Sequence, residues 1–208
     1  MPPAAFLEGL RETSREHGIV LVVDEVQSGM GRTGKMFASE HFNLKADVVS
    51  IAKGIASGLP LGVTCARAEL MSWPPGAHAS TFGGNPVSCA AANVTIRLLK
   101  ESLVANAAKV GAHLFDGLRE LQKKHPVVGD VRGIGLMIGI EFVRDRQTKE
   151  RAIAERNALV QAMFRRGVLI LGAGKNAIRL APPLVFTKDQ ADIVLETMDA
   201  SLGEISKR

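Results

Sequence analysis

The chain has 208 residues with 46% hydrophobic side chains, 23% charged side chains and a formal net charge of +5. This is the composition of a globular protein long enough to bury a core, in one large domain or two small ones. No apolar run approaches the ~20 residues of a membrane span. The basic residues are scattered without stacking aromatics, so we expect neither a membrane nor a nucleic-acid partner.

The two cysteines, Cys65 and Cys89, form neither a metal-ligand spacing nor a disulfide framework. Free thiols are typical of a reducing compartment, and the first residues lack the basic and apolar regions of a secretory signal. We therefore expect a cytoplasmic protein that holds no metal.

The first half of the chain alternates predicted helices with short strands. An amphipathic helix is predicted over residues 4–17, with Gly18 as its stop. The apolar run 19–23 is predicted as a strand that is covered on both faces, as in a parallel sheet. Two further strands and two helices complete this half, at 46–52, 61–66, 85–100 and 103–124.

The pattern changes after His125-Pro126. We predict two strands joined at Gly133, then a helix, two short strands and a final helix with Thr187 as its N-cap, at 127–132, 134–143, 150–166, 168–171, 177–180 and 188–205. The pattern indicates an α/β fold in two parts. A partial large domain with a mainly parallel sheet spans 1–97, and a C-terminal α+β small domain spans 98–208.

Residues 28–36, SGMGRTGKM, resemble a phosphate-binding loop at first sight. Gly29, Gly31 and Gly34 satisfy G-x-G-x-x-G, and the stretch from Gly29 to Lys35 satisfies most of a Walker A loop. However, Met36 replaces the Ser or Thr that would hold magnesium, and several residues separate the glycines from the preceding strand. Nucleotide binding stays an alternative without its confirming context.

Polar side chains follow two neighbouring predicted strands. Asp24 ends the first strand, Gln27 lies three residues on, and Lys53 comes directly after the next strand. Because ligand contacts gather at the carboxyl ends of strands in α/β sheets, we expect Asp24 and Lys53 to project into one crevice. An amine and a carboxylate in one pocket indicate pyridoxal phosphate, which forms a Schiff base with Lys and takes an acidic partner at its ring nitrogen. Taken singly, each residue is better explained as a solvated side chain at a strand end.

Five blocks of sequence then appear in a fixed order: VVDEVQSGMGRTG, DVVSIAKGIASGLPLG, STFGGNPVSCAAA, VVGDVRGIGLMIGIEF and IRLAPPL. Together they closely resemble the class III pyridoxal-phosphate-dependent aminotransferases of fold type I, in particular 4-aminobutyrate and other ω-amino-acid aminotransferases. The resemblance implies pyridoxal 5'-phosphate as cofactor, and transamination between an ω-amino acid and a 2-oxo acid such as 2-oxoglutarate. It also implies a homodimer for the complete enzyme.

The resemblance assigns roles to five residues of this chain. Lys53 would form the Schiff base with the cofactor and move a proton during catalysis, and Asp24 would pair with the protonated ring nitrogen. Gln27 would lie near the phenolic oxygen of the cofactor. Thr81 would bind the phosphate of the neighbouring subunit's cofactor, and Arg179 would bind a substrate carboxylate.

The resemblance covers only the C-terminal half of that family, whose members are roughly twice this length. The family's upstream Gly-rich phosphate segment and its ring-stacking aromatic residue have no counterpart here, so we expect an incomplete form of the enzyme. Three alternatives stay open. They are N-acetylornithine aminotransferase, which STFGGNP also suits, another class III aminotransferase or racemase, and a non-catalytic fragment that acts as a binding partner.

Overall fold

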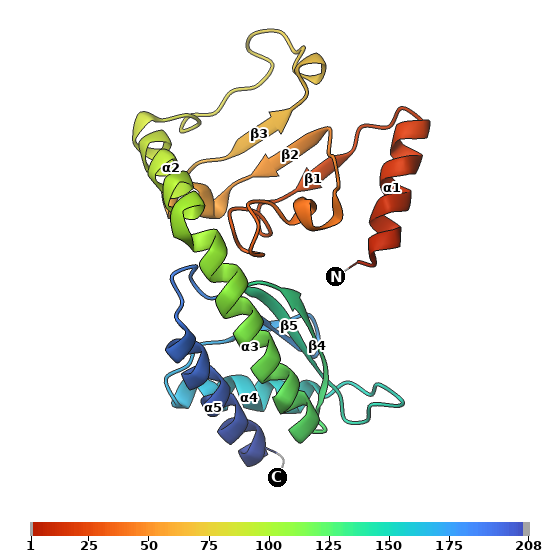
Figure 1. The fold of residues 1–208 in the computed structure, drawn as a ribbon, viewed down its shortest axis with the longest axis vertical. Coiled ribbons are helices and arrows are strands. Elements are labelled where there is room, and N and C mark those ends of the chain that lie inside the picture. The colour runs from red at the N-terminus through yellow and green to blue at the C-terminus, as the bar shows by residue number, and fades with distance from the viewer. Residues whose placement is uncertain (1, 206–208) are drawn as a thin grey trace. The chain divides into compact units, whose positions relative to one another are not determined.

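The computed structural model describes residues 2–205. The chain divides into two compact units, Met1–Ala105 and Asn106–Arg208, and each unit contains one sheet (Figure 1). The expected domain boundary at residues 97 and 98 stays a prediction. Among the described residues, no helix is both long and apolar enough to cross a membrane.

The first unit is built around a three-stranded sheet in the order β1-β2-β3. β1, Val22–Asp24, pairs in parallel with β2, Val48–Ile51, and β3, Val63–Ala66, pairs antiparallel with β2. The parallel character expected from the sequence therefore holds for β1 and β2, while β3 reverses direction. All three strands lie within or at the expected ranges, although β1 begins later and ends one residue later than predicted.

The expectation that the first strand is covered on both faces is wrong for this chain. Ile19, Val20 and Val22 are 56%, 46% and 58% exposed. The reason is topological, because β1 is an edge strand in the part of the sheet that the structure describes. Apolar composition alone does not show whether the neighbouring elements that would bury a strand are present.

The helices of the first unit begin and end where local chemistry predicts. α1, Ala4–Glu16, is followed by Gly18 at φ +63°, a left-handed conformation that glycine adopts without steric cost. α2, Pro86–Leu98, begins after Asn85, whose side chain accepts a hydrogen bond from the Ser88 amide at 2.9 Å. Short 3-10 helices span Ala38–Phe42, Lys53–Ala56 and Ala68–Leu70.

The chain stays helical between the two long helices predicted from the sequence. A π-helical segment, Leu99–Leu103, joins α2 to α3, Val104–Lys124. The predicted interruption after residue 100 is therefore a local widening of the helix rather than a loop.

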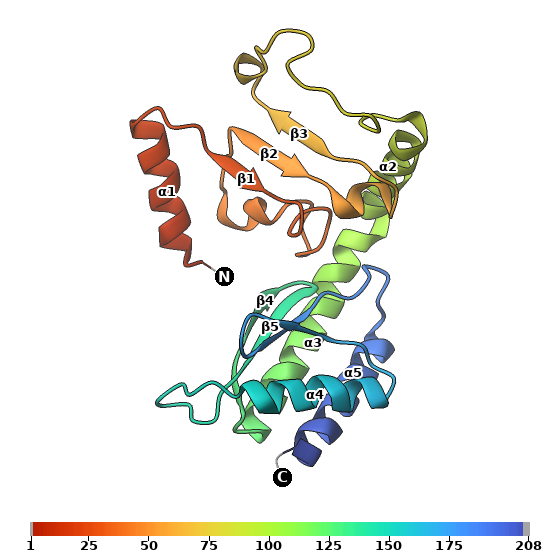
Figure 2. The same cartoon turned by 180° about the vertical axis from the view of Figure 1, so that it is seen from behind.

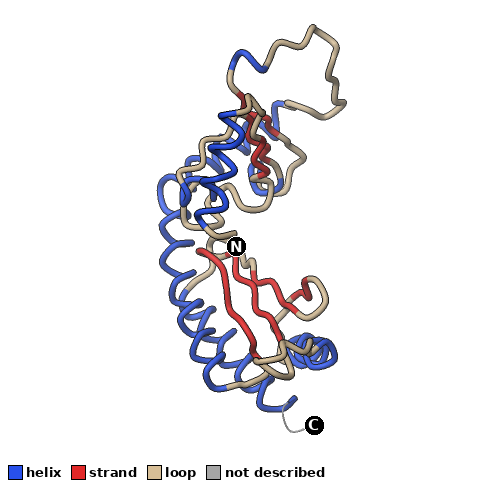
Figure 3. The backbone as a smooth tube through the Cα atoms, turned by 90° about the vertical axis from the view of Figure 1, so that its right-hand side faces the viewer, coloured by secondary structure: helices blue, strands red, loops and turns tan. Residues whose placement is uncertain are grey.

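The second unit contains a four-stranded antiparallel sheet in the order β4-β5-β7-β6. Its strands are β4, Val128–Ile134; β5, Met137–Phe142; β6, Leu171–Ala173; and β7, Ala177–Leu180. Three helices supply the other side of its core: α3; α4, which spans Ile153–Arg165; and α5, which spans Lys188–Ile205. Figure 2 shows α4 beside α5, and the tube in Figure 3 separates the strands from the helices by colour.

Two details of this unit correct the sequence-based prediction. The β4–β5 turn lies at Gly135-Leu136 rather than at Gly133, which lies inside β4. A Cβ atom added at Gly133 would lie 2.3 Å from the Met137 carbonyl oxygen, so the close approach of the two strands requires glycine at this position. The strand predicted at 168–171 begins only at Leu171.

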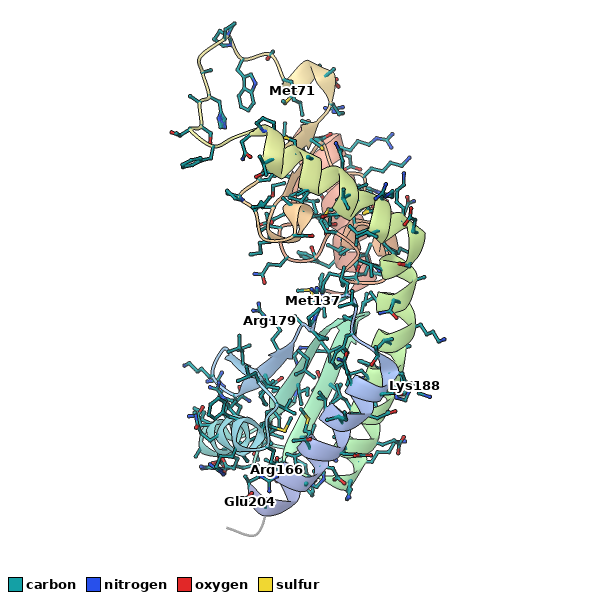
Figure 4. All side chains as sticks on the ribbon, turned by 90° about the vertical axis from the view of Figure 1, so that its left-hand side faces the viewer. Met71, Met137, Arg166, Arg179, Lys188 and Glu204 are labelled. Carbon is teal, nitrogen blue, oxygen red and sulfur yellow. The ribbon has the colours of Figure 1, made fainter. Side chains whose placement is uncertain are left out.

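The expected start of the last helix is confirmed in detail. Thr187 accepts a hydrogen bond from the Gln190 amide at 3.2 Å, and the Gln190 side chain accepts one from the Thr187 amide at 3.0 Å. Near its other end, α5 is joined to the end of α4 by an ion pair of 2.9 Å between Arg166 and Glu204, two residues that Figure 4 labels.

The core of the second unit is made mainly of aliphatic side chains from both the sheet and its helices. Among the described residues, twelve large side chains are less than 2% exposed. One is Leu99, and the others belong to this unit: Phe142, Leu114, Leu118, Leu136, Ile138, Ile140, Leu159, Met163, Ile178, Met198 and Leu202. This burial gives the second unit a hydrophobic core of its own.

The close packing of α3 on the β4–β5 turn yields a first prediction. A Cβ atom at Gly111 would lie 2.3 Å from the Gly135 carbonyl carbon, whereas one at Gly203 in α5 would meet nothing within 4 Å. We expect Gly111→Ala to lower the free energy of unfolding by about 1–3 kcal/mol through overpacking. The control, Gly203→Ala, should raise it by up to about 1 kcal/mol because alanine is the better helix former. Urea unfolding measures both, and equal effects would contradict the packing described.

The carboxylate of Asp199 makes the second unit sensitive to acid. Lys124 Nζ and His125 Nε2 each lie 2.6 Å from one of its oxygens, and the hydrogen bonds from Lys124 and then His125 lower the pKa of the Asp199 carboxyl. A carboxyl whose pKa is lowered on folding stabilises the fold above the unfolded value of about 4, and this contribution is lost as pH falls through the folded value.

Asp199→Asn should therefore lower the free energy of unfolding at neutral pH, and its difference from the wild type should shrink as the pH falls below about 4. Urea unfolding at a series of pH values checks this. A difference that is constant across the series would show that the carboxylate charge contributes nothing.

Candidate functional site

The candidate site lies where β1 and β2 end. Asp24 is the last residue of β1 and is paired with Ser50 of β2. Lys53 follows β2 by two residues and begins the 3-10 helix Lys53–Ala56. Because the two strands are parallel, their carboxyl ends lie at the same end of the sheet. The structure thus brings Asp24 and Lys53 to this end of the sheet, and both residues are exposed.

Asp24 also shapes the turn that follows β1. Its Oδ1 atom accepts a hydrogen bond from the Val26 amide at 2.9 Å, the local contact by which an Asp side chain starts a turn. Gln27 lies in this turn and is exposed. The carboxylate is therefore held at the strand end by its own backbone.

Lys53 has an unusual backbone conformation. Its φ angle is +51°, a left-handed region that costs a residue with a Cβ atom about 1–3 kcal/mol and is often found at functional sites. Ile55 and Ala56 are buried, and the Ser57 hydroxyl lies 2.8 Å from the Thr95 hydroxyl of α2. These contacts hold the short helix, so the strained lysine stays in place.

Glu25, next to Asp24, has a structural role. It is 1% exposed, and its carboxylate accepts hydrogen bonds from the Ser28 hydroxyl, the Ala38 amide and the Ser39 amide at 2.6, 3.1 and 2.7 Å. Glu25 therefore ties the turn after β1 to the segment that follows residues 28–36, the glycine loop.

The glycine loop uses its amides internally. The amides of Gly29, Gly31, Arg32 and Gly34 donate to the carbonyl oxygens of Glu25, Met36, Gly29 and Gly31. A phosphate cradle needs such amides to point at its ligand. The loop is therefore a compact turn that links Glu25 to the following segment, and its geometry argues against nucleotide binding.

Thr81 lies in an exposed stretch that runs from Met71 to Gly84; Figure 4 labels Met71 there. The Ser80 hydroxyl accepts a hydrogen bond from the Gly83 amide at 3.0 Å, and the Asn85 side chain donates to the Phe82 carbonyl at 3.0 Å. These turn contacts connect Thr81 to the start of α2. Its proposed role toward a neighbouring subunit stays a prediction.

Arg179 belongs to the second unit. It is exposed in the middle of β7, directly across from Leu171 of β6 and Gly139 of β5, and Figure 4 labels it. Its role as a carboxylate ligand also stays a prediction, because it lies in a different unit from Asp24 and Lys53.

A second arginine on this sheet has a structural explanation. Arg132 of β4 lies 2.8 Å from Asp130 and 2.9 Å from Glu141. Hydrogen bonds with these two carboxylates raise the pKa of its guanidinium. Arg132 is therefore an ion-pairing residue.

Sequence reasoning missed the contact that positions Lys53. The Ser57–Thr95 hydrogen bond joins residues 38 positions apart, and Thr95 lies outside the five sequence blocks. The only local signal was Gly58, at φ +109° directly after Ser57, which marks an abrupt change of chain direction.

The residues at these strand ends fit pyridoxal phosphate. The cofactor requires an amine for its aldehyde and an acid for its ring nitrogen, and both groups end neighbouring parallel strands here. The backbone next to the lysine is not crowded, because a Cβ atom added at Gly54 would meet only the Met30 side chain, at 3.9 Å. Lys53 would hold the aldehyde end and Asp24 the ring nitrogen.

Comparison with known proteins gives a consistent result. The family model described as aminotransferase class-III matches residues 1–202. The leucine/methionine racemase of Thermococcus litoralis is 40% identical over 100% of this chain and 47% of its own length. The acetylornithine aminotransferase of Caldanaerobacter subterraneus is 36% identical, over 96% of this chain and 49% of its own length.

Solved structures agree with the expected fold type. An amine transaminase from an uncultivated Pseudomonas species, in its pyridoxal-phosphate-bound form, matches with a TM-score of 0.91 and 36% identity, over 98% of this chain and 49% of that one. The expected α/β fold of the pyridoxal-phosphate-dependent transferases is thereby confirmed. The chain spans about half the length of the curated relatives it matches.

The left-handed backbone of Lys53 yields a third prediction. Lys53→Gly should exceed Lys53→Ala in free energy of unfolding by up to about 1 kcal/mol, because only glycine relieves the strain at φ +51°. At Lys109, in the middle of α3, the order should reverse by about 1 kcal/mol because glycine weakens a helix. Urea unfolding of the four variants checks the sign at each position. The same order at both would show that Lys53 is not strained.

Proposed function

The chain belongs to the class III aminotransferase family, and on that premise we propose that it forms part of an enzyme that transfers an amino group from an ω-amino acid to a 2-oxo acid. The observation that carries this proposal is the placement of Asp24 and Lys53 at the carboxyl ends of two paired parallel strands. 4-Aminobutyrate as donor and 2-oxoglutarate as acceptor are the specific substrates proposed.

Pyridoxal phosphate is the cofactor of this family, and when bound it withdraws electrons from the substrate carbon that loses its proton. The Asp24 carboxylate keeps a proton on the ring nitrogen, which maintains that withdrawal. Oδ1 of Asp24 already accepts a hydrogen bond from the Val26 amide, so Oδ2 is the oxygen that pairs with the ring nitrogen.

Lys53 acts as the base and acid of the proposed reaction. Its Nζ atom, freed when the amino donor binds, would take the proton from the substrate carbon and deliver it to the cofactor carbon that had carried the aldehyde. The fixed backbone of the 3-10 helix limits where Nζ can reach, which keeps proton transfer local.

The other residues bind rather than react. Arg179 presents a guanidinium that can hold a substrate carboxylate by two parallel hydrogen bonds. Gln27 would lie near the phenolic oxygen of the cofactor, and the Thr81 hydroxyl would donate a hydrogen bond to the cofactor phosphate of a second subunit. The proposal therefore includes a homodimer as the assembled form of the complete enzyme.

Amino-acid racemisation is a second candidate. The racemases of Thermococcus litoralis and Pyrococcus horikoshii are 40% and 39% identical to this chain, and the same lysine and acid would serve that reaction. Acetylornithine as amino donor is a further option, supported by the Caldanaerobacter relative. A screen of amino donors against 2-oxo acids, with chiral analysis of the recovered amino acid, separates the three.

A fourth prediction tests the cofactor attachment directly. The purified chain, mixed with pyridoxal phosphate, should develop an absorbance band near ~420 nm. Borohydride reduction and peptide mapping should then place the label on Lys53. Lys53→Ala should abolish both band and label, while Lys109→Ala in α3 should leave them unchanged.

A label on another lysine would contradict the assignment of Lys53. A colourless protein that carries no label would favour the alternative of a non-catalytic fragment that acts as a binding partner.

A further inference from the structure

A basic cavity of about 520 Å³ lies in the first unit. It is bordered by α1, the chain that leads into β1, the segment before β2 and the residue that follows β3. Four basic side chains and one acidic side chain line it: Arg11, Arg15, Lys45, Arg67 and Asp47. Its volume is in the range of small-molecule sites.

The cavity is at the opposite end of the sheet from the candidate cofactor site. Residues 18–21 of its lining precede β1, Asp47 immediately precedes β2, and Arg67 immediately follows the antiparallel β3. All of them are therefore at the amino ends of β1 and β2. Asp24 and Lys53 are at the carboxyl ends of the same strands.

The one carboxylate in the lining is fully engaged by its neighbours. Asp47 Oδ1 lies 3.2 Å from Arg67 Nε, and its Oδ2 accepts the Leu21 amide at 2.8 Å. Arg67 also lies 3.3 Å from Glu69. The charge of Arg67 is therefore balanced within the fold.

The three other basic side chains are not balanced in this way. Within residues 2–205, none of Arg11, Arg15 and Lys45 has a carboxylate within the 4.0 Å of an ion pair. Arg11 donates to the Asn43 carbonyl at 3.5 Å, which turns its guanidinium toward the segment that carries Lys45. Positive charge from two different elements therefore surrounds one cavity.

The spacing of the arginines adds a physical reason for an anion. Arg11 and Arg15 are four residues apart in α1 and face the same cavity, and like charges at this spacing destabilise a helix. An anion between them would remove that repulsion. Guanidinium groups bind phosphate oxygens by paired hydrogen bonds, and a neighbouring lysine adds a point charge.

We propose that this cavity binds a small phosphate-bearing molecule, at a site separate from that of pyridoxal phosphate. Arg11 and Arg15 hold the phosphate oxygens from one side and Lys45 from the other. Because Arg15 and Lys45 are exposed and Arg11 is only partly buried, binding weakens as ionic strength rises.

Isothermal titration calorimetry with inorganic pyrophosphate tests the proposal. The wild-type chain should bind it at low ionic strength, and Arg15→Gln should weaken binding by about tenfold or more, as should Lys45→Gln. The matched control is Arg97→Gln, which removes one exposed arginine from α2 of the same unit and should leave the affinity unchanged. Thermal melts followed by circular dichroism confirm that each variant is folded.

Three outcomes would overturn the proposal. The first is a wild-type chain that does not bind pyrophosphate. The second is an equal loss of affinity in Arg97→Gln and Arg15→Gln, which would indicate a general effect of net charge. The third is loss of binding in Lys53→Ala, which would place the anion at the cofactor site instead.

Discussion

The parallel pairing of β1 with β2 is the constraint on which the candidate site depends. The register that sets Asp24 against Ser50 places this carboxylate at the same end of the sheet as Lys53, which follows β2 by two residues. A strand running the other way would separate them by the length of the sheet. Neither residue is special alone, since solvated acids and lysines commonly end strands. Their chemistry depends on the direction of two short strands.

The second requirement is that the lysine be held in an unfavourable conformation. The left-handed backbone at Lys53 costs free energy that its surroundings must supply. The buried Ile55 and Ala56 and the Ser57–Thr95 hydrogen bond anchor the segment to α2. α2 begins at the Asn85 cap, directly after the stretch that carries Thr81. Lys53 and Thr81, the residue proposed to bind the cofactor phosphate, are therefore both in segments attached to α2.

The features that could be predicted from the sequence are those set by residue type and near neighbours in the chain. The helix stop at Gly18, the Thr187 cap and the placement of Asp24 and Lys53 at strand ends all follow from residue type and order. Exposure of β1 could not be predicted, because burial depends on neighbouring elements rather than on the strand itself. The Ser57–Thr95 contact and the basic cavity were also missed, since they join residues far apart in the chain and in no shared motif.

The edge position of β1 has a consequence for Asp24 itself. Leu21 and Glu25 direct their bonding backbone groups toward β2, as the Val48–Leu21 and Glu25–Ser50 hydrogen bonds show. By strand alternation, the peptide groups of Val22 and Asp24 face outward from the sheet. A polypeptide that laid an additional strand along this margin would bond directly to the residue that carries the carboxylate. The same hydrogen bonds that extend the sheet would then also fix the backbone of Asp24.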